Sequence, residues 1–405
     1  TIRKYNESVY FAQIIGYTGK INPEELQALQ EKDETYALND TVGKSGIESS
    51  MEMELQGRKG SETVFVDNLG KVIETSARVE PAAGNDVWLT LDTELQKVSY
   101  HILESKLASI LLASLENIKE YHVPEGGSGG NIKLPVYDVY FACINNNIID
   151  TAHFAQPDAK ETEKIVYQTY LDKKARVNAT LLQELEETRT PYKDLTKEYQ
   201  NYESYIVSML YDNDIIMRSA IDRDDKTYIA WTTDEVISLN EYLTYAIAQN
   251  WVDVSKLDID SQYSDSVEIY QKLTDYIFEQ LDSDLKFDKK IYRYMINNDE
   301  LTGRQICQLL LEQDLVQIPD EELQQFQAGN ETAYTFMYKR IENLDITPAQ
   351  LALDPFSGSI VVTDVNNGNV LALVSYPSYD NNKMANGVDA AYFAGRIMEA
   401  ENAYN

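Results

Sequence analysis

The sequence predicts an α+β protein in which short strands and helices near the two ends of the chain flank a large, mostly helical middle. Valine-rich segments around the turns DNLG and NNGN predict hairpins within residues 57–81 and 358–376. From about residue 155 to 345, apolar residues return at helical spacing almost without interruption. Strand signals and helical signals therefore occupy different parts of the chain, as in an α+β fold.

The first 80 residues combine turns, short strands and one clear helix start. Gly16 and Gly19 bracket a tight turn in AQIIGYTGKI. In NPEELQAL, Pro23 suits the first helical position and Asn22 suits the N-cap before it. A helix is therefore expected to begin at Pro23.

A strand and then a long helix are expected before the middle of the chain. The stretch GNDVWLTLD predicts a strand with Val87, Leu89 and Leu91 on one face. Asp92 is the expected N-cap of a helix over 92–112. Apolar residues keep helical spacing along that helix, at Leu95, Val98, Ile102, Leu103, Leu107 and Ile110.

The middle of the chain follows the clearest flexible linker, PEGGSGGN at residues 124–131. The next stretch, LPVYDVYFACI at 134–144, is rich in β-branched and aromatic residues and predicts a strand. Helices dominate after it, and Thr232 with Glu235 forms an expected capping box. No period repeats, so the middle is not expected to be a solenoid.

Composition restricts the classes of function. Hydrophobic residues make up 43% of the 405 residues, which is enough for a substantial core and argues against wholesale disorder. The formal net charge is −32, and such a surface repels nucleic acid and anionic lipid headgroups. No run of eighteen apolar residues occurs, so no membrane span is expected within the chain. The chain begins at Thr1 without a signal-like stretch, which indicates a fragment, and a removed anchor is one explanation.

Cysteine and histidine usage argues against disulfide staples and metal sites. Cys143 and Cys307 are too few for a disulfide framework; two buried free thiols are expected, with a single bridge as the alternative. The acidic stretch DSDLKFD lacks the glycine and the distal glutamate of a calcium loop, and no phosphate-binding or dinucleotide fingerprint occurs. We therefore expect no metal and no cofactor. The histidines show no ligand spacing, and they are His101, His122 and His153.

Three short patterns match letters that serine acyl-enzymes use, namely S-x-x-K at 283–286, S-x-N at 238–240 and K-[ST]-G at 44–46. We reject them as a catalytic set, because each fixes only two or three positions and their order along the chain is reversed. The acids around Ser283 would also keep Lys286 protonated, whereas a general base must accept the proton of the serine hydroxyl. No catalytic residue is expected within the chain.

Five stretches form an ordered set of motifs. They are RKYNESVYFAQIIGYTGKI (3–21), VGKSGIE (42–48), LQGRKG (55–60), GNDVWLTLDTELQ (84–96) and DPFSGSIVVTDVNNGNVLALVSYPSYDNN (354–382). Together they cover about two-fifths of the chain, and they resemble the non-catalytic pedestal module and the start of the transpeptidase domain of class B penicillin-binding proteins. The resemblance implies structural roles for Arg3, Gly16, Tyr17, Gly19, Gly43, Lys44, Ser45, Gly46, Glu48, Gly57 and Asp92. Lys44 is expected to bond backbone carbonyls or Glu48.

The resemblance implies four parts of the chain. They are the pedestal or dimerisation module (1–90), the first transpeptidase-domain helix (91–125), a mostly helical insertion (126–345) and the opening hairpin of the transpeptidase domain (346–405). The hairpin strands are apolar at successive positions, so both of their faces need cover. The helix over 92–112 would cover one face. Further strands, and a helix that opens on the S-x-x-K serine, are expected beyond Asn405.

The full protein would resemble a peptidoglycan D,D-transpeptidase, held on the extracytoplasmic side of the cell membrane by an anchor that this chain lacks. Peptidoglycan stem peptides and β-lactams would react with its serine. Implied partners are a membrane glycosyltransferase of the shape, elongation, division and sporulation family and a second copy of the chain. Whether it acts in elongation and cell shape, in division or in sporulation stays open. One alternative is a non-enzymatic docking module of a cell-wall complex, and another is an independent sensor or ligand domain in the helical middle.

Overall fold

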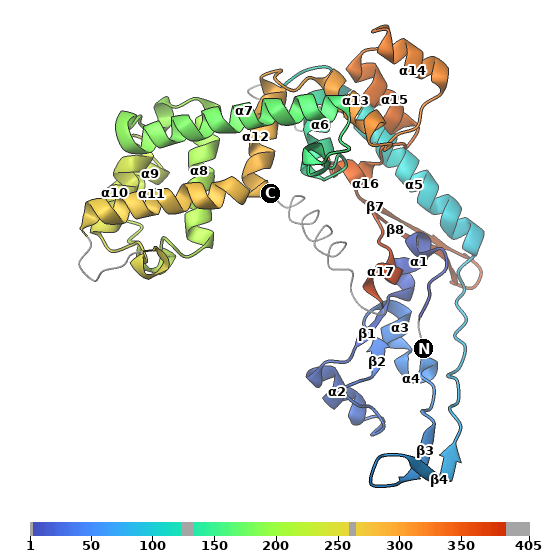
Figure 1. Ribbon diagram of the computed structural model, residues 1–405. Coiled ribbons are helices and arrows are strands. Elements are labelled where there is room, and N and C mark those ends of the chain that lie inside the picture. Colours follow the sequence, from blue (N-terminus) through green and yellow to red (C-terminus); the bar gives the residue numbers. More distant parts are fainter. Residues whose placement is uncertain (1–2, 123–132, 259–264, 386–405) are drawn as a thin grey trace. The chain divides into compact units, whose positions relative to one another are not determined.

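The structure is a computed structural model that describes residues 3–122, 133–258 and 265–385. It has the predicted α+β character (Figure 1). The described residues divide into two compact units. Unit 1 comprises residues 3–115 and 338–385, and unit 2 comprises residues 116–122, 133–258 and 265–337. The linker predicted at 124–131 lies outside the described residues.

Unit 1 contains short helices, one long helix and the antiparallel strand pairs β1–β2, β3–β4 and β7–β8. Its elements are α1 (Ser8–Ile15), β1 (Thr18–Lys20), α2 (Pro23–Gln30), β2 (Thr41–Gly43), α3 (Gly46–Ser50), α4 (Glu52–Leu55), β3 (Ser61–Val66), β4 (Val72–Val79), α5 (Thr93–Ser114), α16 (Pro348–Leu351), β7 (Gly358–Thr363), β8 (Val370–Tyr376) and α17 (Asn381–Met384). The division between the units falls within β5 (Leu115–Glu116) and within α15 (Ala333–Glu342), whereas β6 (Leu134–Pro135) lies in unit 2.

Local signals explain where the helices α2 and α5 begin. The Asn22 side chain accepts a hydrogen bond from Glu25 N, and Pro23 takes the first helical position, as predicted. The Asp92 carboxylate accepts a hydrogen bond from Leu95 N at the start of α5, also as predicted. In both cases a short polar side chain satisfies one of the backbone donors that a helix start leaves free.

The main core of unit 1 lies between α5 and the β7–β8 hairpin. Tyr100 and Leu107 of α5 pack against Val374 and Tyr376 of β8. Strands β7 and β8 pair from Gly358↔Tyr376 to Thr363↔Val370, and their side chains alternate in burial. One face of the predicted hairpin is thus covered by α5. On the other face Val361 and Leu373 are exposed, at 58% and 41%.

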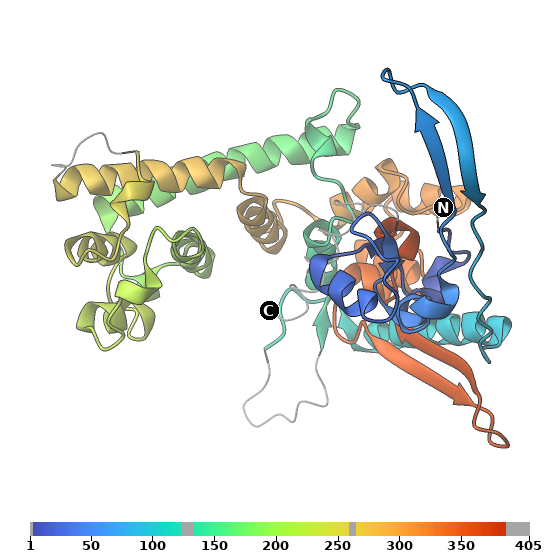
Figure 2. The same cartoon turned by 90° about the horizontal axis from the view of Figure 1, so that it is seen from below.

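The hairpin β3–β4 has no core of its own. All of its strand residues are exposed, including the apolar side chains of Phe65 and Ile73. The two strands pair from Ser61↔Val79 to Val66↔Val72, with two register shifts. Figures 1 and 2 show β3–β4 projecting from the remainder of unit 1 at the end of two extended segments.

Unit 2 is mostly helical in its described residues, apart from loops, the two-residue strand β6 and an isolated bridge. Its elements are α6 (Val136–Asn145), η2 (His153–Ala155), α7 (Glu161–Gln183), η3 (Glu184–Thr188), η4 (Tyr192–Asp194), α8 (Lys197–Asp212), η5 (Arg218–Ala220), α9 (Lys226–Thr232), α10 (Leu239–Ala248), η6 (Val254–Lys256), α11 (Ser266–Ser283), α12 (Leu285–Asn297), α13 (Gly303–Glu312) and α14 (Asp320–Gln327). The long helix α7, green in Figure 1, packs against α12 and α13. Its continuation η3 is a short π-helix that ends at Arg189, whose φ is 55°.

Large aromatic side chains fill the core of unit 2. Tyr202 meets Phe287 with ring centroids 5.4 Å apart, and Trp231 stacks on Tyr242 at 5.3 Å. Ion pairs are buried beside them: Lys173 lies 2.8 Å from Glu198, and its side chain is 9% exposed. The abundant tyrosines of this region are therefore largely packing residues.

The strand predicted from Val87 to Leu91 does not form, because the segment is irregular. Its end makes only two backbone-directed contacts with β8, from Thr90 Oγ1 to Val370 O at 2.7 Å and from Asp92 N to Leu371 O at 2.9 Å. Trp88 is 90% exposed. Alternating side chains alone do not make a strand where no neighbouring strand offers a ladder of hydrogen bonds.

The strand predicted at 134–144 is wrong, because this stretch forms helix α6. Val136, Val139, Tyr140 and Cys143 are all buried, and their spacing of three and four residues is helical. A short apolar run that is buried on most sides carries no reliable period.

The capping box predicted at Thr232 and Glu235 is also wrong. Thr232 is the last residue of α9. The box lies six residues later, where Ser238 Oγ accepts from Glu241 N and Glu241 Oε2 accepts from Ser238 N at 2.8 Å. Both sites match the letters of a capping box, and the packing of α10 selects the second.

Within the described residues, none of the helices combines the length and the apolarity that a membrane span requires.

Candidate functional site

The N-terminal segment is tied to α3 by a two-bond ion pair. Arg3 Nε lies 2.7 Å from Glu48 Oε1, and Arg3 Nη2 donates to Glu48 Oε2 at 2.8 Å. Glu48 is buried, at 5% exposure, so its carboxylate depends on this partner. Hydrogen bonding to Glu48 raises the pKa of Arg3 above its ordinary value. Two of the residues implied by the resemblance are thus direct partners, 45 positions apart.

Glycines let two of the motif stretches cross with their backbones in close approach. Gly16 ends α1 with φ at 76°, and a Cβ there would lie 2.0 Å from Ser45 O. Gly46 has φ at 57°, and its Cβ would lie 2.4 Å from Ile14 O. No side chain fits at either position without moving backbone. We call this contact of Gly16, Ser45 and Gly46 the glycine crossing.

Lys44 does not bond Glu48, contrary to our expectation. Its Nζ lies 2.5 Å from Glu25 Oε2, and Gly19 faces the Lys44 side chain. The Lys44 backbone N–H donates to Tyr17 O at 2.8 Å, next to the β1–β2 pair. Arg3 binds both oxygens of Glu48, and Lys44 pairs instead with Glu25, whose Oε2 also accepts from Asn22 N at 2.8 Å.

The remaining motif residues make separate contacts. A Cβ at Gly43 would lie 2.0 Å from Glu48 O, and one at Gly57 would lie 2.3 Å from Ala82 O. The rings of Tyr17 and Tyr379 meet edge to face at 6.4 Å. Close backbone approach is therefore the common feature of these glycine positions.

A buried glutamine joins α1, α5 and β8. Gln96 Nε2 donates to Tyr10 O at 2.8 Å and to Leu373 O at 2.9 Å, and Gln96 Oε1 accepts from Leu373 N at 2.8 Å. Gln96 is 1% exposed. Its amide replaces a strand partner for Leu373 and so fixes the position of β8 on α5.

Two asparagines after β8 return to the N-terminal segment. Asn382 Oδ1 accepts from Tyr5 N at 2.8 Å, and Asn382 Nδ2 donates to Tyr5 O at 2.9 Å. Asn381, which has no exposed surface, donates from Nδ2 to Gly16 O at 2.8 Å and from its backbone N–H to Ser8 Oγ at 2.9 Å. We call this set of contacts the asparagine latch.

The structure gives each of the three rejected letter patterns a structural use. Ser283 ends α11 and Lys286 lies in α12, so the two do not share a helix face. Ser238 is the N-cap of α10, and Asn240 Nδ2 donates to Leu185 O and to Tyr270 Oη. With the Lys44–Glu25 pair, these contacts give the residues of all three patterns structural partners, and the patterns do not come together as a site for acyl transfer.

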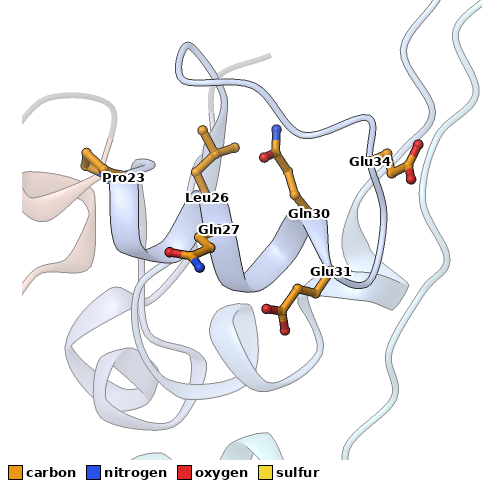
Figure 3. Close-up of a pocket in the computed structure, with 6 residues that line it drawn as sticks. All are labelled: Pro23, Leu26, Gln27, Gln30, Glu31 and Glu34. Carbon is orange, nitrogen blue, oxygen red and sulfur yellow. The ribbon is translucent and has the colours of Figure 1, made fainter.

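The described residues contain no group of three or more His, Cys, Asp or Glu that could hold a metal ion. Both cysteines are buried free thiols, and burial raises the pKa of Cys143 to about 12, which disfavours a nucleophilic thiolate. Figure 3 shows a shallow depression along α2, and its lining combines no nucleophile with a base. It is lined by Pro23, Leu26, Gln27, Gln30, Glu31 and Glu34.

Comparison with known proteins assigns the N-terminal region. A family model described as the penicillin-binding protein dimerisation domain matches residues 1–89. The peptidoglycan D,D-transpeptidase MrdA of Salmonella typhimurium is 34% identical over 138 residues, which are 34% of this chain and 21% of that protein. These matches support a class B penicillin-binding protein, and they cover only part of the chain.

Two further relatives of this penicillin-binding protein match shorter stretches. MrdA of Acinetobacter baumannii is 38% identical over 109 residues, 27% of this chain and 16% of that protein. Penicillin-binding protein 2A of Bacillus subtilis is 43% identical over 72 residues, 18% of this chain and 10% of that protein. The chain therefore spans about a fifth or less of the length of the curated relatives it matches.

Sequence reasoning missed the asparagines of this penicillin-binding protein. The stretch YPSYDNN stands only at the end of the last motif, and asparagine is common in turns of any kind. Nothing in the local pattern indicates partners more than 360 positions away. The signal available was the ordered motif set itself, in which this loop ends the last motif and its partners lie in the first.

Proposed function

We propose that this penicillin-binding protein acts as a peptidoglycan D,D-transpeptidase of the serine acyl-enzyme type. The observation that carries the proposal is the match of residues 1–89 to the dimerisation domain together with relatives that are named as D,D-transpeptidases. A serine hydroxyl attacks the penultimate D-alanine carbonyl of a stem peptide and expels the terminal D-alanine. The amine of a neighbouring peptide then takes the acyl group and frees the serine. A β-lactam acylates the same serine.

We place the nucleophilic serine outside residues 1–405. The candidate residues within the chain have structural roles, which supports this placement. Ser283 ends α11, Ser238 caps α10 and Lys44 pairs with Glu25. The chain would supply the non-catalytic module, and α5 with the β7–β8 hairpin would supply the first elements of the catalytic sheet. The exposed face of that hairpin, with Val361 and Leu373, suits further strands or helices of the same domain.

The proposed location is the extracytoplasmic side of the cell membrane, with a membrane anchor outside these 405 residues. Stem peptides and β-lactams would bind at the catalytic region. A membrane glycosyltransferase of the shape, elongation, division and sporulation family, and a second copy of the chain, are the proposed protein partners. The charge of −32 fits a surface that avoids nucleic acid and anionic headgroups.

Labelling with a fluorescent penicillin tests the proposed reaction. The full-length protein should be acylated at one serine, which mass spectrometry should locate outside residues 1–405. The 405-residue chain is the control and should stay unlabelled, including at Ser283. An adduct within the chain, or no labelling of the full-length protein, would contradict the proposal.

A second function is favoured by one specific observation, the fully exposed hairpin β3–β4. A non-enzymatic docking module would use such an arm, since apolar side chains on both faces offer area for a protein partner. This function predicts binding of a purified membrane glycosyltransferase that weakens in Phe65→Ser and Ile73→Ser variants. Binding with that dependence and no penicillin labelling would favour docking over catalysis.

A further inference from the structure

The asparagine latch connects two parts of unit 1 that are far apart in sequence. Asn381 and Asn382 begin α17, directly after the segment that leaves β8. Their partners Tyr5, Ser8 and Gly16 belong to the matched dimerisation domain. The contacts therefore run from that domain to the strand pair that begins the proposed catalytic sheet.

Both asparagines bind backbone atoms, which makes their amides difficult to replace. Asn382 pairs with both the N–H and the C=O of Tyr5, as a strand neighbour would. Asn381 needs its Nδ2 donor for Gly16 O. An aspartate has the same shape but no donor, and its carboxylate would face a carbonyl oxygen at either position.

The glycine crossing sets the position of the acceptor that Asn381 binds. Gly16 reaches its backbone conformation only without a Cβ, and Ser45 O would lie 2.0 Å from such an atom. Tyr379 Oη donates to Ala12 O at 3.0 Å and Gln13 Nε2 donates to Pro377 O at 3.0 Å, so the whole exit segment follows α1. The glycine crossing therefore positions Gly16 O, and the asparagine latch depends on that position.

We propose that Asn381 and Asn382 are positioning residues that set the direction in which the chain leaves β8 toward the catalytic region. This inference rests on the proposed transpeptidase function for its consequence. The dimerisation domain would then hold the catalytic sheet in place through backbone hydrogen bonds to these two side chains. The described contacts of both asparagines reach the N-terminal segment, so each acts through the segment it holds.

Hydrogen exchange of the 405-residue chain tests the latch itself. In N382D and N381D the amides of residues 378–385 should exchange about tenfold faster, because an unmet buried hydrogen bond weakens the closed state by about that factor. Asn6→Asp is the matched control, because Asn6 is exposed and the substitution adds the same charge next to Tyr5. Equal exchange in N382D, N381D and N6D would overturn the latch.

Acylation of the full-length protein by a fluorescent penicillin tests the positioning role. The second-order rate constant should fall at least tenfold in N382D and stay unchanged in N6D. Gly70→Ala controls for general loss of stability, since Gly70 lies in the β3–β4 turn with φ at 81° and open space around it. A loss in G70A as large as that in N382D would overturn positioning. Absence of labelling in the wild type would instead contradict the proposed function, and the exchange experiment would still decide the latch.

Discussion

Units 1 and 2 hold their polar groups by different means. In unit 1, buried amides and glycines bring backbone segments together, as at Gly16, Gln96 and Asn381. In unit 2, large aromatic rings fill the space between helices and charged side chains pair with one another, as Lys173 does with Glu198. Unit 1 should therefore be most sensitive to an added atom at a crossing, and unit 2 to a changed volume or charge in its core.

The largest effect is expected for Gly16→Ala in unit 1. The new Cβ would lie 2.0 Å from Ser45 O at a positive φ, so the glycine crossing must open. We expect a loss of about 4 kcal/mol or more in the stability of unit 1. Hydrogen exchange of α5 and β8 measures it. Gly70→Ala, with a similar φ and no neighbour within 4 Å, is the control and should cost about 1 kcal/mol.

The second effect concerns the buried Glu203 of unit 2, which is 1% exposed and has no partner for Oε2. Burial, and then the charge of Glu184, raises the pKa of Glu203 to about 8, from an ordinary value of 4.5. Between these values the folded state keeps a proton that the unfolded state has lost, so stability falls as the pH rises. Glu203→Gln should remove this loss, so the free energy of unfolding of the variant should exceed that of the wild type by roughly 3 kcal/mol at pH 9.

Fluorescence of the buried Trp231 and Trp251, both in unit 2, follows this unfolding in urea. Glu187→Gln is the control, since Glu187 is exposed and its loss changes the net charge equally. A parallel pH dependence in the wild type and in E203Q would show that Glu203 is not the titrating group.

A smaller effect is expected for Arg3→Met in unit 1. The variant leaves the buried Glu48 carboxylate without its two hydrogen bonds. Because the Arg3 side chain is itself 41% exposed and water can reach it, we expect a loss of about 2 kcal/mol. Arg78→Met breaks the exposed pair with Glu80 and should change stability little. Equal losses in both variants, measured by hydrogen exchange of α3, would refute the buried role of Glu48.

The smallest effect is expected for His153→Gln in unit 2. A hydrogen bond to Glu163, at 2.7 Å, raises the pKa of His153 above 6.5. The protonated ring therefore stabilises unit 2 below pH 6.5, and this contribution disappears as the pH rises through the raised pKa. The wild type should exceed H153Q in urea midpoint at pH 5.5 and approach it in alkaline buffer. His122→Gln, at an exposed site, is the control for loss of a histidine in general.

Residues close together in the sequence correctly predicted the helix starts and the hairpins. Asn22 and Asp92 cap α2 and α5 as expected, and both hairpins form around their turns. The stretch at 134–144 was misassigned because burial on most sides removes the period that distinguishes a helix from a strand. The strand at 84–92 failed because a ladder needs a partner, which no local pattern supplies.

The candidate site divides in the same way. The motif order indicated Arg3, Gly16, Gly46 and Glu48 before any coordinates. The pairing of Arg3 with Glu48, and of Lys44 with Glu25, depends on which side chains the folded backbone brings together. The asparagine latch was not predictable, since its two sides are separated by more than 360 positions.

The sequence by itself determined the α+β class, the starts of the capped helices, the two hairpins and the identity of the family, because each depends on residues close together along the chain or on a motif order. Only the tertiary structure decided that Gln96 joins α1, α5 and β8, that Gly16 and Ser45 meet, and that Asn381 and Asn382 bind Gly16 and Tyr5. The physical reason is that the backbone N–H of any residue can donate to a suitably placed side-chain amide, and its C=O can accept from one. Position in space selects such partners. The backbone group can belong to a residue of any type, so the sequence gives no sign of which residue it will be.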